Sequence, residues 1–491
     1  MSNENDNSVN IISNSNKKAI QDKKPIIFNI NDNNSQVKLE TILNLSENYF
    51  KKTFLSNKIL NIIIILFLPI IIVAEIFFRN PLFNKSLTIE ENIQKYMGGS
   101  DSIGIKFFKY FSDIGGIYFM GVCYIIVFIF FTIIDTFVYG FGIIFAVYLH
   151  AVMKIWYANS RPYLEKEVLY QGVCDGGYGN PSGHSIIALY GYLTFLSYIL
   201  KNKNIRNKII LKIIFIIIFI VWILLIPFSR IVLGVHGLNQ VIYGSLLGIW
   251  LFLFFSFVFK FDQMPVSLYR KFFKQKYYIL FFVCFFIICL ALAIISRFTI
   301  NKNKDFNSLN QKVDVNCKRV KEYKRFHIGS LHDSLILVAM IGLYCGQCLF
   351  WFLIDNKYKK NKKNKKIGNS KKDENNNRDN ENDLVTVNFV IDELINKWSL
   401  FRSQICAHWW NMFKIIGVLI VCLIPIVLYL FISKNIDVGL ILTFKTAVPM
   451  FIIAFLIFSF GLYEFVVITC GSKEILLSNA NTKSEIIIQN N

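Results

Sequence analysis

Three short clusters of residues have side chains that suit the chemistry of a phosphate group. Lys154 and Arg161 form the first, Pro-Ser-Gly-His at 181–184 forms the second, and Arg230 with His236 forms the third. Arginine and lysine bind phosphate oxygens, and glycine lets backbone N–H groups approach an anion. Two histidines can supply a nucleophile and a proton donor. Together the clusters predict a site that binds a phosphate ester and transfers its phosphoryl group.

The first cluster has a spacing that suits a helix. Arg161 lies seven positions, about two helical turns, after Lys154. A helix that continues past Ala158 would therefore place both cations on one side. Taken singly, each residue also has an ordinary explanation. A lysine at the end of an apolar run reaches the membrane interface, and Arg161 followed by proline is a signal that stops a helix.

The second and third clusters also have ordinary explanations when each is taken alone. The Pro-Ser-Gly-His sequence opens an apolar run, so its free N–H groups could bind phosphate, but Ser182 could equally cap the helix. Arg230 could lie at the membrane interface, and His236 could be a histidine with satisfied hydrogen bonds. Coincidence is a poor explanation for all three clusters in one chain, in this order.

Long apolar stretches separate the clusters and must position them. The chain is 54% hydrophobic and 16% aromatic, and runs of about 20 apolar residues predict membrane-spanning helices. The sequence therefore predicts an all-α fold, a polytopic membrane helical bundle with about ten transmembrane helices and a six-helix catalytic core. The apolar runs cover 59–78, 116–134, 138–157, 184–200, 209–228, 241–259, 278–296, 334–354, 414–432 and 446–469.

The composition divides the chain into three parts. Residues 1–57 are rich in Asn, Ser, Lys and Asp and are predicted to form a disordered cytoplasmic tail. Residues 58–262 contain six predicted spans and every candidate catalytic residue. Residues 263–491 add about four spans, with a polar loop near 357–383 that is predicted to be flexible.

The basic residues predict an orientation in the lipid bilayer. The formal net charge is +21, but Lys and Arg gather mostly in alternate connections between spans, which argues against a nucleic-acid partner. The positive-inside rule places those connections in the cytoplasm, and by parity all three clusters lie on the lumenal or exoplasmic side. The long basic connection at 297–333 is an exception. We predict a multi-pass protein of the endoplasmic reticulum or another endomembrane. Cys174 and Cys317 both fall on the non-cytoplasmic side, and whether they form a disulfide stays open.

The pattern Lys-x6-Arg-Pro, Pro-Ser-Gly-His, Ser-Arg-x5-His resembles the type 2 phosphatidic acid phosphatase superfamily, which includes lipid phosphate phosphatases, glucose-6-phosphatase and the vanadium haloperoxidases. The resemblance covers about 60–260. It implies a helical core and a phosphohistidine mechanism that needs no metal and no cofactor. By motif position, it implies that His236 attacks phosphorus and that His184 protonates the leaving oxygen. It also implies that the phosphoryl oxygens are held by Lys154, Arg161, Ser182, Gly183 and Arg230.

The third cluster departs from the common pattern of that superfamily. Most members have Asp four residues after the histidine of this motif, whereas this chain has Gln240. Glucose-6-phosphatase is similar to this chain in having Gln there and in the stretch Cys-Asp-Gly-Gly-Tyr-Gly-Asn at 174–180. A Gln carbonyl can orient an imidazole without adding negative charge, so we expect Gln240 to orient His236. These likenesses favour a soluble sugar phosphate as the substrate.

Two other functions remain open from the sequence. The N-terminal anchor and the first six spans resemble the arrangement of lipid phosphate phosphatases, which act on phosphatidate or sphingoid phosphates. A non-catalytic phosphate-binding transporter would also suit about ten spans and cations within the membrane, although it needs no pair of histidines. A haloperoxidase is disfavoured because those relatives are soluble.

Overall fold

The computed structural model describes residues 58–98, 102–166, 177–201, 205, 208–259, 264, 266–296, 311–315 and 336–369. The chain divides into two compact units, Met1–Ser56 and Asn57–Asn491, and all the described residues belong to the second. Some predicted features therefore lie outside the described residues. These are the N-terminal tail, the apolar runs at 414–432 and 446–469, and the two cysteines Cys174 and Cys317.

All regular secondary structure within the described ranges is helical. The helices are α3 (Lys58–Tyr96), α4 (Ile103–Ile114), α5 (Ile117–Phe130), α6 (Ile133–Tyr157), α7 (Pro162–Glu165), α8 (Gly183–Lys201), α10 (Ile209–Val232), α11 (Leu238–Leu253), α12 (Val266–Lys274), α13 (Lys276–Ile295) and α16 (Leu337–Asn369). A π-helical turn, Phe254–Val258, extends α11. The predicted all-α class is therefore confirmed for the part of the chain that the structure describes.

Seven of the described helical segments are long and apolar enough to cross a membrane: Lys58–Tyr96, Ile103–Phe128, Ile134–Glu165, Gly183–Lys201, Ile209–Val232, Leu238–Val258 and Lys276–Ile295. Each overlaps one of the first seven predicted runs, and the eighth run corresponds to a shorter apolar helix, Leu337–Leu353. These helices support a multi-pass integral membrane protein. The total of about ten spans is not confirmed, because the last two runs fall outside the described residues.

A separate helix, α4, directly precedes the second predicted span, which begins with α5. α4 begins where the Ser102 side chain accepts a hydrogen bond from the Ile105 N–H, and it ends at Gly115. α5 starts after Gly116, at the beginning of the predicted run. A serine cap at the start and glycines at the junction are ordinary boundaries of helices. The extra helix α4 packs against α10 and reaches the candidate site.

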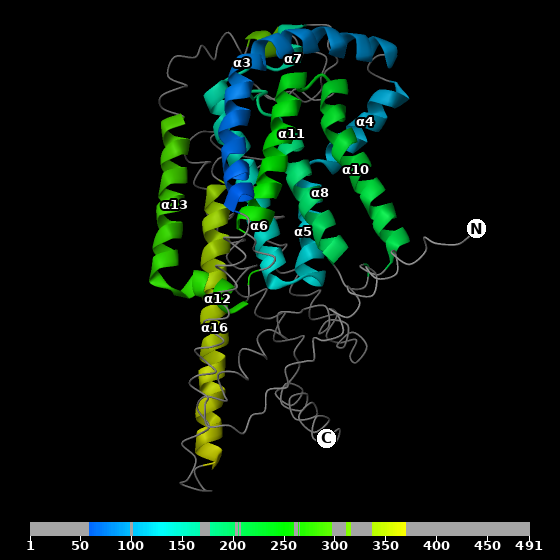
Figure 1. Ribbon diagram of the computed structural model, residues 1–491. Coiled ribbons are helices and arrows are strands. Elements are labelled where there is room, and N and C mark those ends of the chain that lie inside the picture. The colour runs from blue at the N-terminus through cyan, green and yellow to red at the C-terminus, as the bar shows by residue number, and fades with distance from the viewer. Residues whose placement is uncertain are drawn as a thin grey trace, which may run out of the picture. The chain divides into compact units, whose positions relative to one another are not determined.

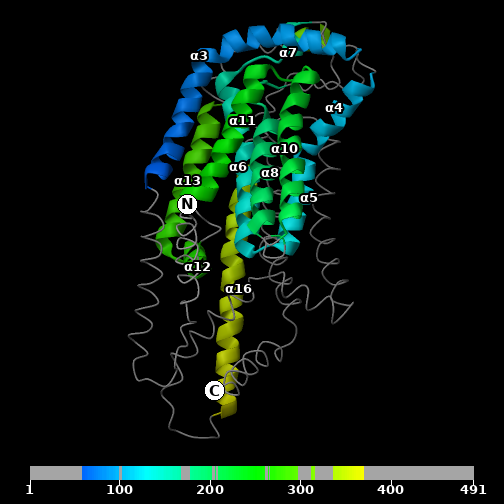
Figure 2. The same ribbon diagram turned by 45° about the vertical axis from the view of Figure 1, so that its right-hand side comes forward.

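α3 is too long to cross a bilayer in a straight line. It has 39 residues, which corresponds to about 58 Å of helix against about 30 Å of hydrocarbon. Figures 1 and 2 show that α3 runs along the bundle and then bends across the end at which α7 lies. Pro69 and Pro81 lie within α3 and each lacks an N–H donor, which permits a bend. The second part of α3 therefore covers one end of the bundle.

Two glycines on α11 allow it to pack closely against α8. A Cβ atom on Gly244 would lie 2.6 Å from the carbonyl oxygen of Ser182, and one on Gly248 would lie 2.6 Å from that of Ile186. Small residues four positions apart let two membrane helices approach at backbone distance. This approach fixes the start of α8, which carries the second cluster, next to the start of α11, which follows the third.

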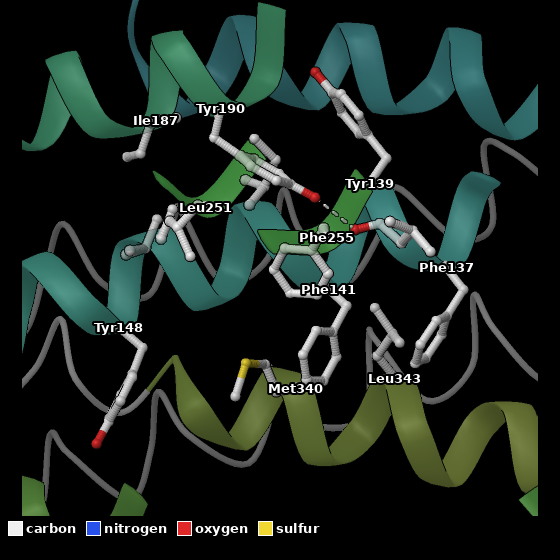
Figure 3. Close-up of a cluster of buried hydrophobic side chains, with 14 of the residues drawn as sticks. Phe137, Tyr139, Phe141, Tyr148, Ile187, Tyr190, Leu251, Phe255, Met340 and Leu343 are labelled. Carbon is white, nitrogen blue, oxygen red and sulfur yellow. Dashed lines mark hydrogen bonds between the residues drawn. The ribbon is translucent and has the colours of Figure 1, made fainter. Parts of the chain in front are cut away.

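The hydrophobic core extends beyond residue 263. Figure 3 shows Met340 and Leu343 of α16 beside Phe137 and Phe141 of α6, and all four side chains are buried. In the same core, the Tyr190 hydroxyl of α8 donates to the Val138 carbonyl of α6 at 2.9 Å. Burying a large apolar side chain contributes about 1.5–3 kcal/mol. α16 is therefore part of the packing that supports α6 and the site at its end.

α16 extends into the polar segment near 357–383. The segment near 357–383 is predicted to be a flexible loop, but α16 continues to Asn369, so the first residues of that segment are helical. Lysine is a good helix former, so a lysine-rich stretch is compatible with a helix. The residues after Asn369 lie outside the described part of the chain.

Candidate functional site

The first cluster does not lie on one continuous helix. α6 ends at Tyr157, and Ala158 has a left-handed conformation with its N–H bonded to the Lys154 carbonyl. Arg161 follows in an extended conformation, and Pro162 begins the short helix α7. The expectation that one helix places Lys154 and Arg161 on the same side is therefore wrong. Proline is favoured in the first turn of a helix, so it begins a new helix here as well as separating it from α6.

Arg161 connects the first cluster to the regions of the other two. Its side chain is buried. Nε donates to the Gly177 carbonyl at 2.8 Å, and an Nη donates to the Val235 carbonyl at 3.2 Å. Gly177 lies before the second cluster, and Val235 is the neighbour of His236. The guanidinium, with several donors in fixed positions, is suited to hold these two segments together and still face an anion.

The second cluster lies at the N-terminal end of α8, as the sequence predicts. α8 begins at Gly183, and the Ser182 N–H donates to the Gln240 carbonyl at 3.0 Å. The Ser182 hydroxyl accepts from Ser185 at 3.0 Å. His184 is half-buried, and a Cβ on Gly116 would lie 3.7 Å from its Nε2. The junction of α4 and α5 therefore forms a wall beside the His184 imidazole.

Arg230 has a partner that the three motif clusters do not include. Its side chain is buried in the last turn of α10, and an Nη donates to the Ser112 hydroxyl of α4. Ser112 shares the buried face of α4 with Ile105 and Phe108. Spacing of three and four residues is that of one helical face, so the signal for a buried serine was present. Its contact with Arg230 requires the packing of α4 on α10.

His236 has a defined tautomer. The side chain is 2% exposed. Its Nδ1 lies 2.8 Å from the Gly179 carbonyl oxygen and 3.2 Å from Oε1 of Gln240. Both neighbours accept hydrogen bonds, so Nδ1 carries the proton and Nε2 of a neutral imidazole has the lone pair. The Gly179 carbonyl is an orienting group that the motifs do not predict, and it lies in the 174–180 stretch that resembles glucose-6-phosphatase.

Several cations lie near His236. Burial lowers the pKa of His236 well below its usual range, and the positive charges of Arg161, Arg230, Lys154 and His184 lower that pKa further. The five side chains, from all three clusters, are therefore close enough to interact electrostatically. A lowered pKa favours the neutral imidazole, which a nucleophile requires. Among the described residues, no group of three or more His, Cys, Asp and Glu side chains is arranged to hold a metal ion.

Both the oxygen and the nitrogen of the Gln240 side-chain amide form hydrogen bonds. Oε1 accepts from the Gly237 N–H at 3.2 Å and lies against His236, while Nε2 donates to the Ser160 carbonyl at 2.9 Å. A Cβ on Gly179 would lie 2.5 Å from Oε1, so only glycine fits there. An aspartate at 240 would have no donor for Ser160. The geometry gives a physical reason for Gln at this position.

The second part of α3 covers the loop that carries His236. A Cβ on Gly237 would lie 2.8 Å from the Phe83 ring and 2.9 Å from the Ser86 hydroxyl. Gln94 donates to the Val232 carbonyl at 3.1 Å. Near the first cluster, Lys166 pairs with Glu91 at 2.8 Å. These contacts explain why His236 is buried although it lies in a connection between helices.

Replacing Gln240 with glutamate is expected to move the acid limb of the pH profile to higher pH. Glutamate has the same length and still accepts from His236, but its negative charge stabilises imidazolium and raises the pKa of His236. Neutral His236 is present above its pKa and is lost as the pH falls through it, so a higher pKa shifts the acid limb upward. Because the Ser160 carbonyl would face a carboxylate, the maximum rate should also fall. The measurement is kcat/KM against pH for both proteins. An active variant with an unmoved acid limb would contradict the contact.

Comparison with known proteins gives a match to one family model and to one solved structure. Residues 135–265 match the model of the PAP2 superfamily, and this range contains every site residue that the sequence predicts. The crystal structure of a transmembrane PAP2-type phosphatidylglycerolphosphate phosphatase from Bacillus subtilis is 24% identical, covering 41% of this chain and 96% of that chain, with a TM-score of 0.34. No curated protein matches the chain significantly. The family match begins within α6 and leaves out α3, α4 and α5.

Proposed function

We propose that this chain is a membrane-embedded phosphatase that hydrolyses phosphomonoesters through a phosphohistidine on His236. One observation carries the proposal. Nδ1 of His236 is held by the Gly179 carbonyl and by Gln240, which leaves the lone pair on Nε2, and cations of all three clusters lie close enough to lower the pKa of His236. The match of residues 135–265 to the PAP2 superfamily supports the same chemistry.

The first step of the proposed reaction is transfer of the phosphoryl group to His236. Nε2 attacks phosphorus, a P–N bond forms, and the P–O bond to the alcohol breaks with its electrons passing to the leaving oxygen. His184, as imidazolium, gives that oxygen a proton. In the second step a water molecule attacks phosphorus, His184 takes a proton from it, and the P–N bond breaks. Inorganic phosphate leaves, and both histidines return to their starting states.

The cations and the start of α8 are assigned to the phosphate. Phosphoryl transfer depends mainly on positioning and on neutralisation of oxygen charge. Lys154, Arg161 and Arg230 would supply positive charge, and the Ser182–Gly183 segment would supply N–H donors at a helix N-terminus. Gln240 would keep His236 in the attacking tautomer.

The test of the proposed function is phosphate release by the purified protein in detergent. p-Nitrophenyl phosphate should be hydrolysed at the same rate with and without a metal chelator, because the proposed mechanism uses side chains alone. His236→Ala is the matched inactive control. A folded preparation that binds inorganic phosphate, carries it across a vesicle membrane and releases none from esters would establish the transporter alternative.

The substrate class is a finer part of the proposal. The preference for a sugar phosphate rests on the resemblance at Gln240 and 174–180, and the comparisons do not support it. Two observations favour a lipid phosphate instead. The first six apolar helices resemble the arrangement of lipid phosphate phosphatases, and residues 135–265 match the PAP2 superfamily.

A panel of substrates separates the two classes. Phosphatidate and a sphingoid phosphate in mixed micelles should be hydrolysed with a higher kcat/KM than glucose 6-phosphate under the same conditions. A higher kcat/KM for glucose 6-phosphate would restore the sugar phosphate as the substrate and leave the phosphatase proposal intact.

The orientation of the site leads to a separate prediction. Because the basic connections are assigned to the cytoplasm, a membrane-impermeant phosphomonoester should reach the site in sealed microsomes only after detergent opens them. Latency is the ratio of the hydrolysis rate after detergent to the rate in sealed microsomes. A lumenal marker enzyme is the control for intact vesicles. Full activity in intact, correctly oriented vesicles would place the site on the cytoplasmic side.

A further inference from the structure

Three asparagines, one beside each motif cluster, contact a pair of charged residues on α3. Asn159 precedes Arg161 by two positions, Asn180 precedes Ser182 by two, and Asn239 directly precedes Gln240. Their partners are Glu75 and Arg79, which are four positions apart on α3 and so lie on one face of the helix. One turn of α3 therefore contacts an asparagine beside each of the three clusters.

Glu75 joins the second cluster to the third. Its Oε1 accepts from the Asn180 amide at 2.6 Å and from the Asn239 amide at 3.2 Å. Glu75, Asn180 and Asn239 are all buried. Within the described part of the chain, neither asparagine Oδ1 has a hydrogen-bond partner. The bond to Glu75 is therefore the contact that fixes the orientation of each of these two side chains.

Arg79 reaches the first cluster. An Nη of Arg79 donates to the Asn159 side-chain oxygen at 3.3 Å, and the guanidinium lies 5.9 Å from the centre of the Tyr157 ring. The Tyr157 hydroxyl in turn lies 2.9 Å from the Tyr243 hydroxyl of α11. The end of α6 is therefore held between α3 and α11 by polar contacts.

We infer that Glu75 and Arg79 are positioning residues for the site, holding the three motif clusters in register from a helix that lies outside the segment matched to the PAP2 superfamily. The inference rests on the proposed function. Glu75 acts through Asn180 on the segment that leads into Ser182 and Gly183, and through Asn239 on the turn that contains Gln240. The reactive groups of a phosphoryl-transfer site must be held within a fraction of an ångström, so loss of such a contact lowers the rate without removing any group that touches the substrate.

A purely structural role for Glu75 would be to anchor α3 in the bundle. Ile71 provides the matched control, because it lies one turn earlier on α3 and is also buried, and its contacts are apolar. Ile71→Ala removes packing of α3 and leaves the asparagine contacts in place. The two roles therefore give different results when activity and thermal stability are measured on the same preparations.

The experiment compares Glu75→Ala, Glu75→Gln and Ile71→Ala in full-length protein in detergent. Glu75→Ala is expected to lower kcat by about 10–100-fold, because a misplacement of about 1 Å at the reacting groups can cost about 100-fold, with a smaller rise in KM. Glu75→Gln retains an oxygen acceptor of the same reach and should recover to within a few-fold of wild type. Ile71→Ala should lower Tm and leave kcat near wild type. Equal losses of kcat in Glu75→Ala and Ile71→Ala at equal losses of Tm would overturn the inference.

A double substitution tests the route through Asn239. If Glu75 acts through this residue and its neighbour, Glu75→Ala combined with Asn239→Ala should be little slower than the slower single variant. If the two single losses multiply in the double variant, Glu75 does not act through Asn239. Arg79→Gln should likewise be non-additive with Asn159→Ala.

Binding of inorganic phosphate separates failure of this inference from failure of the proposed function. Phosphate should raise the Tm of the wild-type protein, and this rise should be smaller in Glu75→Ala and normal in Ile71→Ala. If wild type hydrolyses no ester but shows this pattern of binding, the positioning role stands and the phosphatase proposal falls. If wild type is active while Glu75→Ala has normal kcat and normal phosphate binding, only the positioning role falls.

Discussion

Replacing His236 with alanine is expected to abolish hydrolysis of every phosphomonoester, whatever its leaving group. The variant loses Nε2, which is the proposed nucleophile, and the Gly179 carbonyl and Gln240 are left without the ring that they orient. The covalent intermediate should then not form, because the proposed acceptor of the phosphoryl group is missing. The measurement is phosphate release from both alkyl and aryl esters, together with trapping of radiolabelled phosphate on acid-quenched or alkali-quenched protein.

The result must be separated from unfolding, because His236 is buried. The thermal unfolding midpoint of the variant reports on folding, and retention of inorganic phosphate binding shows that Lys154, Arg161 and Arg230 remain in place. A phosphohistidine is labile in acid and stable in alkali, which distinguishes it from a phosphoserine. Label with this behaviour on His236→Ala would assign the nucleophile to another histidine.

Replacing His184 with alanine is expected to give a loss that depends on the leaving group. An alkoxide from a sugar or lipid alcohol is a poor leaving group and needs a proton as the P–O bond breaks, whereas p-nitrophenolate is a stable anion and largely does not. Activity on alkyl phosphates should fall by about 10²–10⁴-fold, the usual scale of general acid catalysis, with a much smaller loss on p-nitrophenyl phosphate. The position of His184 suits this role, since it is half-buried beside Gly116 while His236 is almost completely enclosed.

The labelled intermediate gives a second measurement for His184. With p-nitrophenyl phosphate, His184→Ala should still form phosphohistidine, and the label should persist longer because the base for the attacking water is missing. Equal losses on alkyl and aryl esters, or a variant that takes up no label, would contradict the assignment of His184 as the general acid and base. Each outcome is independent of the identity of the natural substrate.

The sequence contains enough local information to predict the helices and the chemistry of the clusters. Apolar runs of the length of a bilayer predict helices wherever they occur, and all eight that fall in the described residues overlap apolar helices. The start of α8 at Gly183 is likewise local, because proline and serine directly before an apolar run favour a helix boundary there. Histidine, arginine and lysine keep their chemistry in any fold, so the nature of the candidate site follows from the residue types.

The sequence was less informative where the chain changes direction. The expected helix through Ala158 is interrupted, because the left-handed Ala158 and the first-turn Pro162 separate α6 from α7. Side-chain spacing along a supposed helix therefore misplaced Arg161, whose actual position is set by the Gly177 and Val235 carbonyls. These partners come from loops, and no periodic pattern identifies a backbone carbonyl as an acceptor.

Tertiary packing alone decided how the clusters are held together. Ser112 reaches Arg230 because α4 packs on α10, and Gly179 reaches His236 because Gly244 lets α11 approach α8. Glu75 contacts Asn180 and Asn239 across more than a hundred positions of sequence. The residue types determined what the site can do, because that depends on the groups themselves. The fold determined which nitrogen of His236 is available and what holds it, because both depend on partners that become neighbours only when the helices pack.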